Sequence, residues 1–320
     1  MLNSVKTSFR DSVVYGLGNI AVKIIGFLLI PLYTDPKYFS VDDFGVIAVL
    51  DITGLVLISL MASGLPQSMM RWYWDKDHSS NQKGIFFMAL MFQILISLAF
   101  VLLLFPLSQQ LSSAIFRNTD WSRAIRLLVL SSSLQAINNL INTLMRVQSR
   151  SVLFTAVNMS KLAVVLILTI FFIVRGKMGI EGIYLAQAAG NLLFIIILSA
   201  YAVRNISPFF NMSIFREMSR YGFPLLLANF AAASLTVIDR YSLNSLALLK
   251  YVAVYTMAYK ISSVLKLVIV DSIKMAVTPL VLKKMDAPDN GRFYAKTMLY
   301  SSFVLMLGII AVSLFSYEVI

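Results

Sequence analysis

The sequence predicts an all-α, polytopic membrane protein of two helical lobes, the second of them incomplete. Of the 320 residues, 59% are hydrophobic and only 13% are charged, whereas a soluble domain carries about 25% charged residues. The long apolar runs are continuous rather than alternating. Because only helices and closed barrels satisfy the backbone in lipid, continuous runs indicate spanning helices.

About nine segments are long enough to cross the membrane as helices. A spanning helix needs about 20 mostly apolar residues, because the hydrocarbon core is about 30 Å thick. The first segment follows Lys6 and Arg10 as a signal peptide would, but its apolar core is too long and contains Lys23, so we expect it to be retained. The predicted helices are 13–33, 44–65, 84–107, 126–145, 152–174, 180–203, 221–240, 252–280 and 296–316.

Basic residues predict the orientation and the division of the chain. With the N-terminus inside, the inner segments hold 14 Lys and Arg and the outer segments hold 8. This excess favours a cytoplasmic N-terminus. The basic stretch Arg204–Arg220 is the longest cytoplasmic joint. We therefore expect an N-terminal lobe of six helices (1–205), a cytoplasmic linker (206–220) and a partial C-terminal lobe of three helices (221–320).

A weak internal repeat supports two lobes. Tyr15-Gly16 recurs as Tyr221-Gly222, 206 residues later, and the helix starts downstream are similarly spaced. An offset of six helices makes the halves parallel in topology, which is a common plan of transporters. If the second lobe also needs about six helices, this chain stops early, and we expect a truncated or incomplete protein.

Charged side chains inside the predicted helices are the candidate functional residues. A charge at the bilayer centre costs at least ~2.5 kcal/mol, so such residues face a bundle interior or a wet cavity. At 100° per residue, Asp271 and Lys274 lie within about 40° of Lys260, whereas Lys266 lies about 120° away. The candidate cavity residues are Lys23, Asp51, Arg71, Lys161, Asp239, Arg240, Lys260, Lys266, Asp271 and Lys274.

These charges allow two interpretations. Lys23 and Asp51 lie at similar depths and could form an ion pair that only holds the bundle together. The lysine excess around Asp271 instead favours a cationic, water-filled cavity for an anionic group. For Arg71 and Arg240, snorkelling at the interface is an equal alternative. The polar run Ser131–Thr143 could line a pathway or form hydrogen bonds between helices.

Several classes of site find no support in the sequence. The chain has no cysteine and a single histidine, His78, which excludes disulfides, thiolate metal sites and a Ser-His-Asp triad near the membrane. No Walker motif is present, and no basic cluster is interleaved with aromatic residues. We predict no catalytic residue, cofactor, metal site or nucleic-acid partner.

Five segments resemble a known family. The runs YGLGNIAVKIIGFLLIPLYT from Tyr15, DDFGVIAVL from Asp42 and GLPQSMMRWYW from Gly64 resemble the opening of bacterial lipid-linked oligosaccharide flippases. The runs YGFPLLLANFAAASLTVIDRYSLN from Tyr221 and YVAVYTMAYKI from Tyr251 resemble the start of the second lobe of that family. These flippases belong to the multidrug/oligosaccharidyl-lipid/polysaccharide exporter superfamily.

The resemblance implies a two-lobe exporter fold whose helices 1, 2, 7 and 8 line a central cavity. It implies a transporter of the bacterial inner membrane that moves undecaprenyl-pyrophosphate-linked O-antigen or capsule units by alternating access, driven by a proton or sodium gradient. The expected partners are the lipid-linked glycan, membrane lipid, a polysaccharide polymerase and glycosyltransferases. The alternatives are a drug or metabolite antiporter of the same superfamily, which the lysine excess disfavours, and a membrane glycan polymerase, which would need a large periplasmic loop with catalytic residues.

Overall fold

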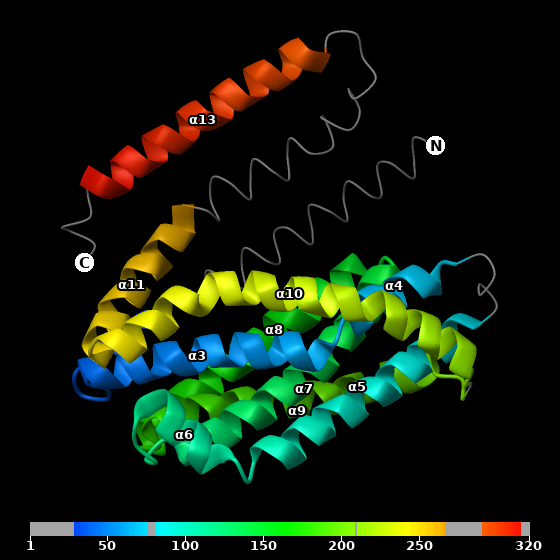
Figure 1. The fold of residues 1–320 in the computed structure, drawn as a ribbon, viewed down its shortest axis with the longest axis horizontal. Coiled ribbons are helices and arrows are strands. Elements are labelled where there is room, and N and C mark those ends of the chain that lie inside the picture. Colours follow the sequence, from blue (N-terminus) through cyan, green and yellow to red (C-terminus); the bar gives the residue numbers. More distant parts are fainter. Residues whose placement is uncertain (1–28, 76–80, 209, 266–289, 315–320) are drawn as a thin grey trace.

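A computed structural model describes residues 29–75, 81–208, 210–265 and 290–314, and among these residues there is no β-strand (Figure 1). The all-α class is therefore confirmed. In chain order the elements are α2 (Ile30–Thr34), α3 (Val41–Ala62), α4 (Leu65–Tyr73), α5 (Gln82–Leu104), α6 (Ser108–Phe116), α7 (Ser122–Val147), α8 (Ser151–Ile170) with a π-helical turn (Phe171–Arg175), α9 (Gly179–Arg204), α10 (Met212–Leu246), α11 (Leu249–Leu265) and α13 (Asn290–Leu314).

Within the described ranges, six helices are long and apolar enough to cross a membrane. They are Val41–Ala62, Gln82–Leu104, Ser122–Val147, Ser151–Arg175, Gly179–Arg204 and Met212–Leu246. Of the other three predicted spans, residues 13–28 of the first (13–33) and residues 266–280 of the eighth (252–280) lie outside the described residues; the described parts of these two spans belong to α2 and α11. The last, 296–316, corresponds to α13, whose apolar part is Tyr294–Ile310. The protein is thus a multi-pass helical membrane protein.

The second predicted helix, 44–65, corresponds to α3 and ends three residues earlier than expected. α3 ends at Ala62, because Ser63 (φ 50°) and Gly64 (φ 70°) are both left-handed. The chain then restarts as α4 with Pro66 in its first turn, where a missing N–H has no cost. At its other end α3 begins with a capping box of Ser40 and Asp43.

α10 is longer than the predicted helix 221–240. Asn211 caps it by accepting hydrogen bonds from the backbone N–H groups of Ser213 (2.9 Å) and Ile214 (3.3 Å), so the expected linker 206–220 is helical from Met212 onward. The charges of this stretch lower its mean hydropathy, so hydropathy did not predict a helix there. That the two lobes join at this linker stays a prediction.

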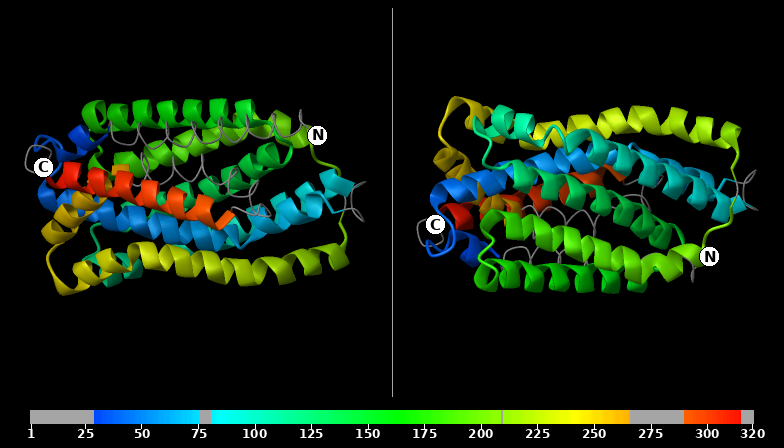
Figure 2. Two further views of the ribbon diagram at one scale, coloured as in Figure 1. Left: turned by 90° about the horizontal axis from the view of Figure 1, so that it is seen from above. Right: turned by 90° about the horizontal axis from the view of Figure 1, so that it is seen from below.

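α10 and α8 lie on opposite sides of the bundle, with α3, α7 and α9 between them (Figure 2). One apolar core packs α3, the start of α7 and the start of α9 against α11, and a second packs α4, α5 and the end of α7 against α10. Large apolar side chains on α5, α8 and α10, such as Leu102 (67% exposed), Ile167 (62%) and Leu235 (81%), point out of the bundle, as expected for a lipid-facing surface.

Candidate functional site

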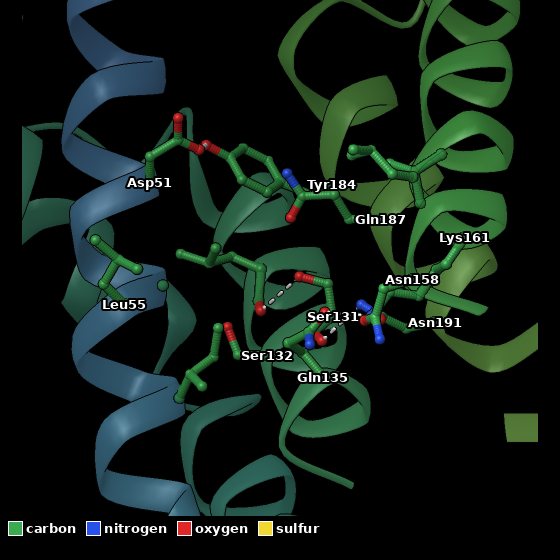
Figure 3. Close-up of a pocket in the computed structure, with 15 residues that line it drawn as sticks. Asp51, Leu55, Ser131, Ser132, Gln135, Asn158, Lys161, Tyr184, Gln187 and Asn191 are labelled. Carbon is green, nitrogen blue, oxygen red and sulfur yellow. Dashed lines mark hydrogen bonds between the residues drawn. The ribbon is translucent and has the colours of Figure 1, made fainter. Parts of the chain in front are cut away.

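A cavity of about 540 Å³ lies between α3, α7, α8 and α9 (Figure 3). This volume is typical of pockets that hold small organic ligands. Leu55, Leu128, Leu162 and Val165 contribute apolar lining. The polar lining consists of Asp51, Ser131, Ser132, Gln135, Asn158, Lys161, Tyr184, Gln187 and Asn191.

The polar run of α7 serves both roles that the sequence left open. Ser131, Ser132 and Gln135 line the cavity. One and two turns further along, Asn138 donates to Asn191 Oδ1 of α9 (3.2 Å), and Asn142 exchanges hydrogen bonds with Asn158 of α8 (3.1 and 3.3 Å). Amide pairs of this kind hold neighbouring helices together where lipid offers no partner. The same helix therefore builds the wall and fixes its neighbours.

Asp51 occupies the middle of α3, as the eleventh of its 22 residues. The Tyr184 hydroxyl of α9 lies 3.1 Å from Asp51 Oδ1, to which it donates, and 3.3 Å from the Ile47 carbonyl oxygen. Asp51 also lies within electrostatic range of Lys260 and Arg240. Lys23, its predicted partner, lies outside the described residues. The hydrogen-bond donor to Asp51 thus comes from α9, and the cations within electrostatic range of it come from α10 and α11.

Lys161 lies near the middle of the span Ser151–Arg175. Its Nζ donates to Gln135 Oε1 (3.1 Å) and to Asn191 Oδ1 (3.3 Å). Both acceptors are neutral amides. Figure 3 shows Lys161 and Asp51 on opposite sides of the cavity. Across the described residues, no carboxylate forms an ion pair with Lys161.

The other predicted residues that the structure describes lie between α10, α11 and the first helices. Arg240 is buried, with its guanidinium 4.3 Å from the centre of the Tyr259 ring. Asp239 accepts hydrogen bonds from the Tyr255 hydroxyl and from the backbone N–H of Arg240 (2.8 Å). Lys260 Nζ lies 5.2 Å from the Phe44 ring centre. These cation–aromatic contacts join α10 and α11 to one another and to α3.

Arg71 lies at the α4–α10 contact, away from the cavity. Its guanidinium is 4.5 Å from the Tyr221 ring centre of α10 and 5.0 Å from that of Trp72. Of the ten predicted residues, then, Asp51 and Lys161 line the cavity, and Arg71, Asp239, Arg240 and Lys260 do not. Lys23, Lys266, Asp271 and Lys274 lie outside the described residues, and so does the predicted stripe that Lys260 shares with the last two.

The sequence pattern predicted the α7 part of the neutral lining, but the part that α9 contributes was not predicted. Tyr184, Gln187 and Asn191 recur at intervals of three and four residues, which places them on one face of α9. That spacing indicates a polar helix face, but these side chains are neutral, and the candidate residues were chosen by charge. Throughout the described ranges, no three His, Cys, Asp or Glu residues come together in a way that could hold a metal ion.

Comparison with solved structures assigns the fold. The inward-facing conformation of a multidrug resistance MATE family transporter of the MOP superfamily aligns over 96% of this chain and 71% of its own, with 16% identity and a TM-score of 0.72. The MATE multidrug transporter DinF-BH aligns over 98% of this chain and 75% of its own, with 14% identity and a TM-score of 0.72. The protein therefore shares the fold of MATE transporters.

Comparison of the sequence with family models gives the family. The model of the polysaccharide biosynthesis protein family matches residues 38–320, and the chain belongs to that family. A comparison with curated protein sequences finds no match.

Proposed function

We propose that the protein translocates a lipid-linked oligosaccharide across the bacterial inner membrane by alternating access, for the synthesis of O-antigen, capsule or exopolysaccharide. The observation that carries this proposal is the match to the polysaccharide biosynthesis protein family in a chain with the fold of MATE transporters. The N-terminus is cytoplasmic in this proposal, and a proton or sodium gradient supplies the energy. Glycosyltransferases act before it, and a polysaccharide polymerase acts after it.

The proposal gives roles to the charged residues. Lys23, Lys260 and Lys274 attract the anionic headgroup or acidic sugars. Asp51, Asp239 and Asp271 pair with cations and exchange partners as the lobes move. The position of Asp51 supports such exchange, because Asp51 lies within electrostatic range of one cation from α10 and one from α11. The lipid tail stays in the bilayer.

The test is genetic and uses the bacterium that encodes the chain. We expect deletion of the gene to remove the surface glycan, and Lys260→Ala to reduce that glycan about tenfold when the variant replaces the native gene. Lys250→Ala is the matched control, since Lys250 is exposed at the start of α11. Unchanged surface glycan in the deletion strain would refute the proposal.

A drug antiporter is the second candidate, because the two solved structures are described as multidrug transporters. Increased drug sensitivity of the deletion strain with a normal surface glycan would favour it. A glycan polymerase, the third class, predicts a different phenotype: its loss leaves single repeat units at the surface, whereas loss of a flippase leaves none.

A further inference from the structure

The cavity between α3, α7, α8 and α9 presents a single cation, Lys161, among the lining residues that the structure describes. An ammonium group near the middle of a membrane span costs at least ~2.5 kcal/mol. Its two acceptors, Gln135 and Asn191, are neutral amide oxygens, and within the described part of the chain no carboxylate pairs with it. A lysine that served only to join helices would be better replaced by a neutral amide, as the pair Asn142–Asn158 shows in the same bundle.

Asp51, the other charged residue of the lining, is engaged elsewhere. It accepts from Tyr184 (3.1 Å), lies within electrostatic range of Lys260 and Arg240, and stands across the cavity from Lys161 (Figure 3). The two charges therefore mark opposite sides of the site. Their separation leaves the Lys161 side electropositive and open to an anionic group.

The neutral groups around Lys161 narrow the class of ligand. Amide side chains donate and accept at once, and serine hydroxyls do the same, which is what a ring of sugar hydroxyls requires. Ser132, Asn158 and Gln187 supply such groups around the cavity, and Leu162 and Val165 offer apolar surface for the C–H face of a sugar ring. A carboxylate forms a charge-assisted hydrogen bond with an ammonium group.

We propose that this cavity binds one acidic sugar residue, of the hexuronate class, with its carboxylate on Lys161 Nζ and its hydroxyls on the surrounding amides. The proposal rests on the function proposed above and deepens it, because it places a sugar of the translocated glycan inside the N-terminal bundle and specifies its charge. Lys161 is then the residue that selects acidic over neutral glycans.

A binding experiment on the full chain in nanodiscs tests this directly. The probes are methyl β-D-glucuronide and methyl β-D-glucoside, which differ in the carboxylate. We expect the wild type to bind the glucuronide about tenfold more tightly. Lys161→Gln should abolish that preference and leave the glucoside dissociation constant within twofold, and Lys161→Arg should keep the preference. Lys83→Gln makes the same change at an exposed lysine outside the cavity and should alter neither.

Three results would overturn the inference: no preference in the wild type, no binding of either probe, or equal weakening of both probes in Lys161→Gln. None of these would affect the evidence from surface glycan in the deletion strain, so the proposed function would survive. Conversely, the deletion strain could keep its surface glycan while the purified protein prefers the glucuronide. The proposed function would then be refuted, and the acidic-sugar site would belong to a protein of another function. The retained preference of Lys161→Arg separates selectivity from misfolding.

Discussion

Asp51 shows what a single residue in this sequence can and cannot predict. An aspartate in the middle of an apolar helix must face polar surroundings, so its inward position follows from the sequence alone. Its partner does not, because Tyr184 lies 133 positions further along the chain and is neutral. Lys161 behaves in the same way, since its depth was predictable and its amide partners were not. A charge inside an apolar helix is easily recognised in a hydropathy profile, whereas a neutral hydrogen-bonding partner is not.

The Asp51–Tyr184 hydrogen bond yields a prediction of its own. Tyr184 is fully buried, and Tyr184→Phe removes the donor to both Asp51 and the Ile47 carbonyl. We expect the free energy of unfolding to fall by about 1–2 kcal/mol, because a buried acceptor loses its partner. Unfolding of the purified protein in detergent measures this.

Tyr251→Phe is the control for that prediction, since Tyr251 is 52% exposed and should change stability by less than about 0.5 kcal/mol. Combining Tyr184→Phe with Asp51→Asn should give a non-additive effect, because the two residues share one contact. Additive losses would show that the hydrogen bond contributes nothing.

At the scale of elements, the sequence predicted helices well and their interruptions poorly. Apolar length is a property of about 20 residues together, and it predicted all six described spans. The break after α3 depends instead on two left-handed residues, Ser63 and Gly64, which an average over a window conceals. The early start of α10 depends on the cap at Asn211, in a segment whose charges lower its hydropathy. Local backbone chemistry, rather than hydrophobicity, sets these ends.

The break also sets how closely α4 approaches α10, and this gives a second prediction. A Cβ at Gly64 would overlap the backbone of Gly222 on α10, and Gly64 is left-handed at φ +70°. Gly64→Ala should therefore cost about 1 kcal/mol for the conformation and about 1–3 kcal/mol more for forcing the helices apart. The drop in melting temperature of the purified protein measures the total.

Gly179→Ala separates those two costs. Gly179 is also left-handed, at φ +54°, but a Cβ there would meet nothing within 4 Å. It should therefore show the conformational cost alone. If both variants lost the same stability, close packing of α4 on α10 would not stabilise the protein.

At the scale of the whole molecule, α10 forms hydrogen bonds with the N-terminal helices near both of its ends. At one end Asn244 and Arg117 form hydrogen bonds with the backbone carbonyls of Ile115 (2.6 Å) and Ser245 (2.8 Å). Near the same end the hydroxyls of Thr53 and Tyr241 lie 2.7 Å apart. At the other end Ser68 donates to the Met218 carbonyl (2.9 Å). The alternating access that we propose requires that the contacts at one end separate while those at the other end hold.

The absence of cysteine from the chain allows that motion to be tested. Ser68 Oγ lies 2.8 Å from the position of a Cβ at residue 222, within reach of a disulfide whose Cβ atoms are about 3.5–4.5 Å apart. In the variant Ser68→Cys with Gly222→Cys, the two sulfur atoms can form a disulfide, so the close approach at residue 222 becomes a covalent bond.

We expect oxidation to hold α4 on α10, at the end that the charge distribution predicts to be cytoplasmic, and to stop loading of substrate from that side. Surface glycan in cells that carry the variant should fall more than about tenfold on oxidation and recover on reduction, while each single-cysteine variant should remain insensitive to oxidant. Full glycan export by the oxidised double variant would show that this contact stays closed throughout transport, and the opening would then have to lie between other helices.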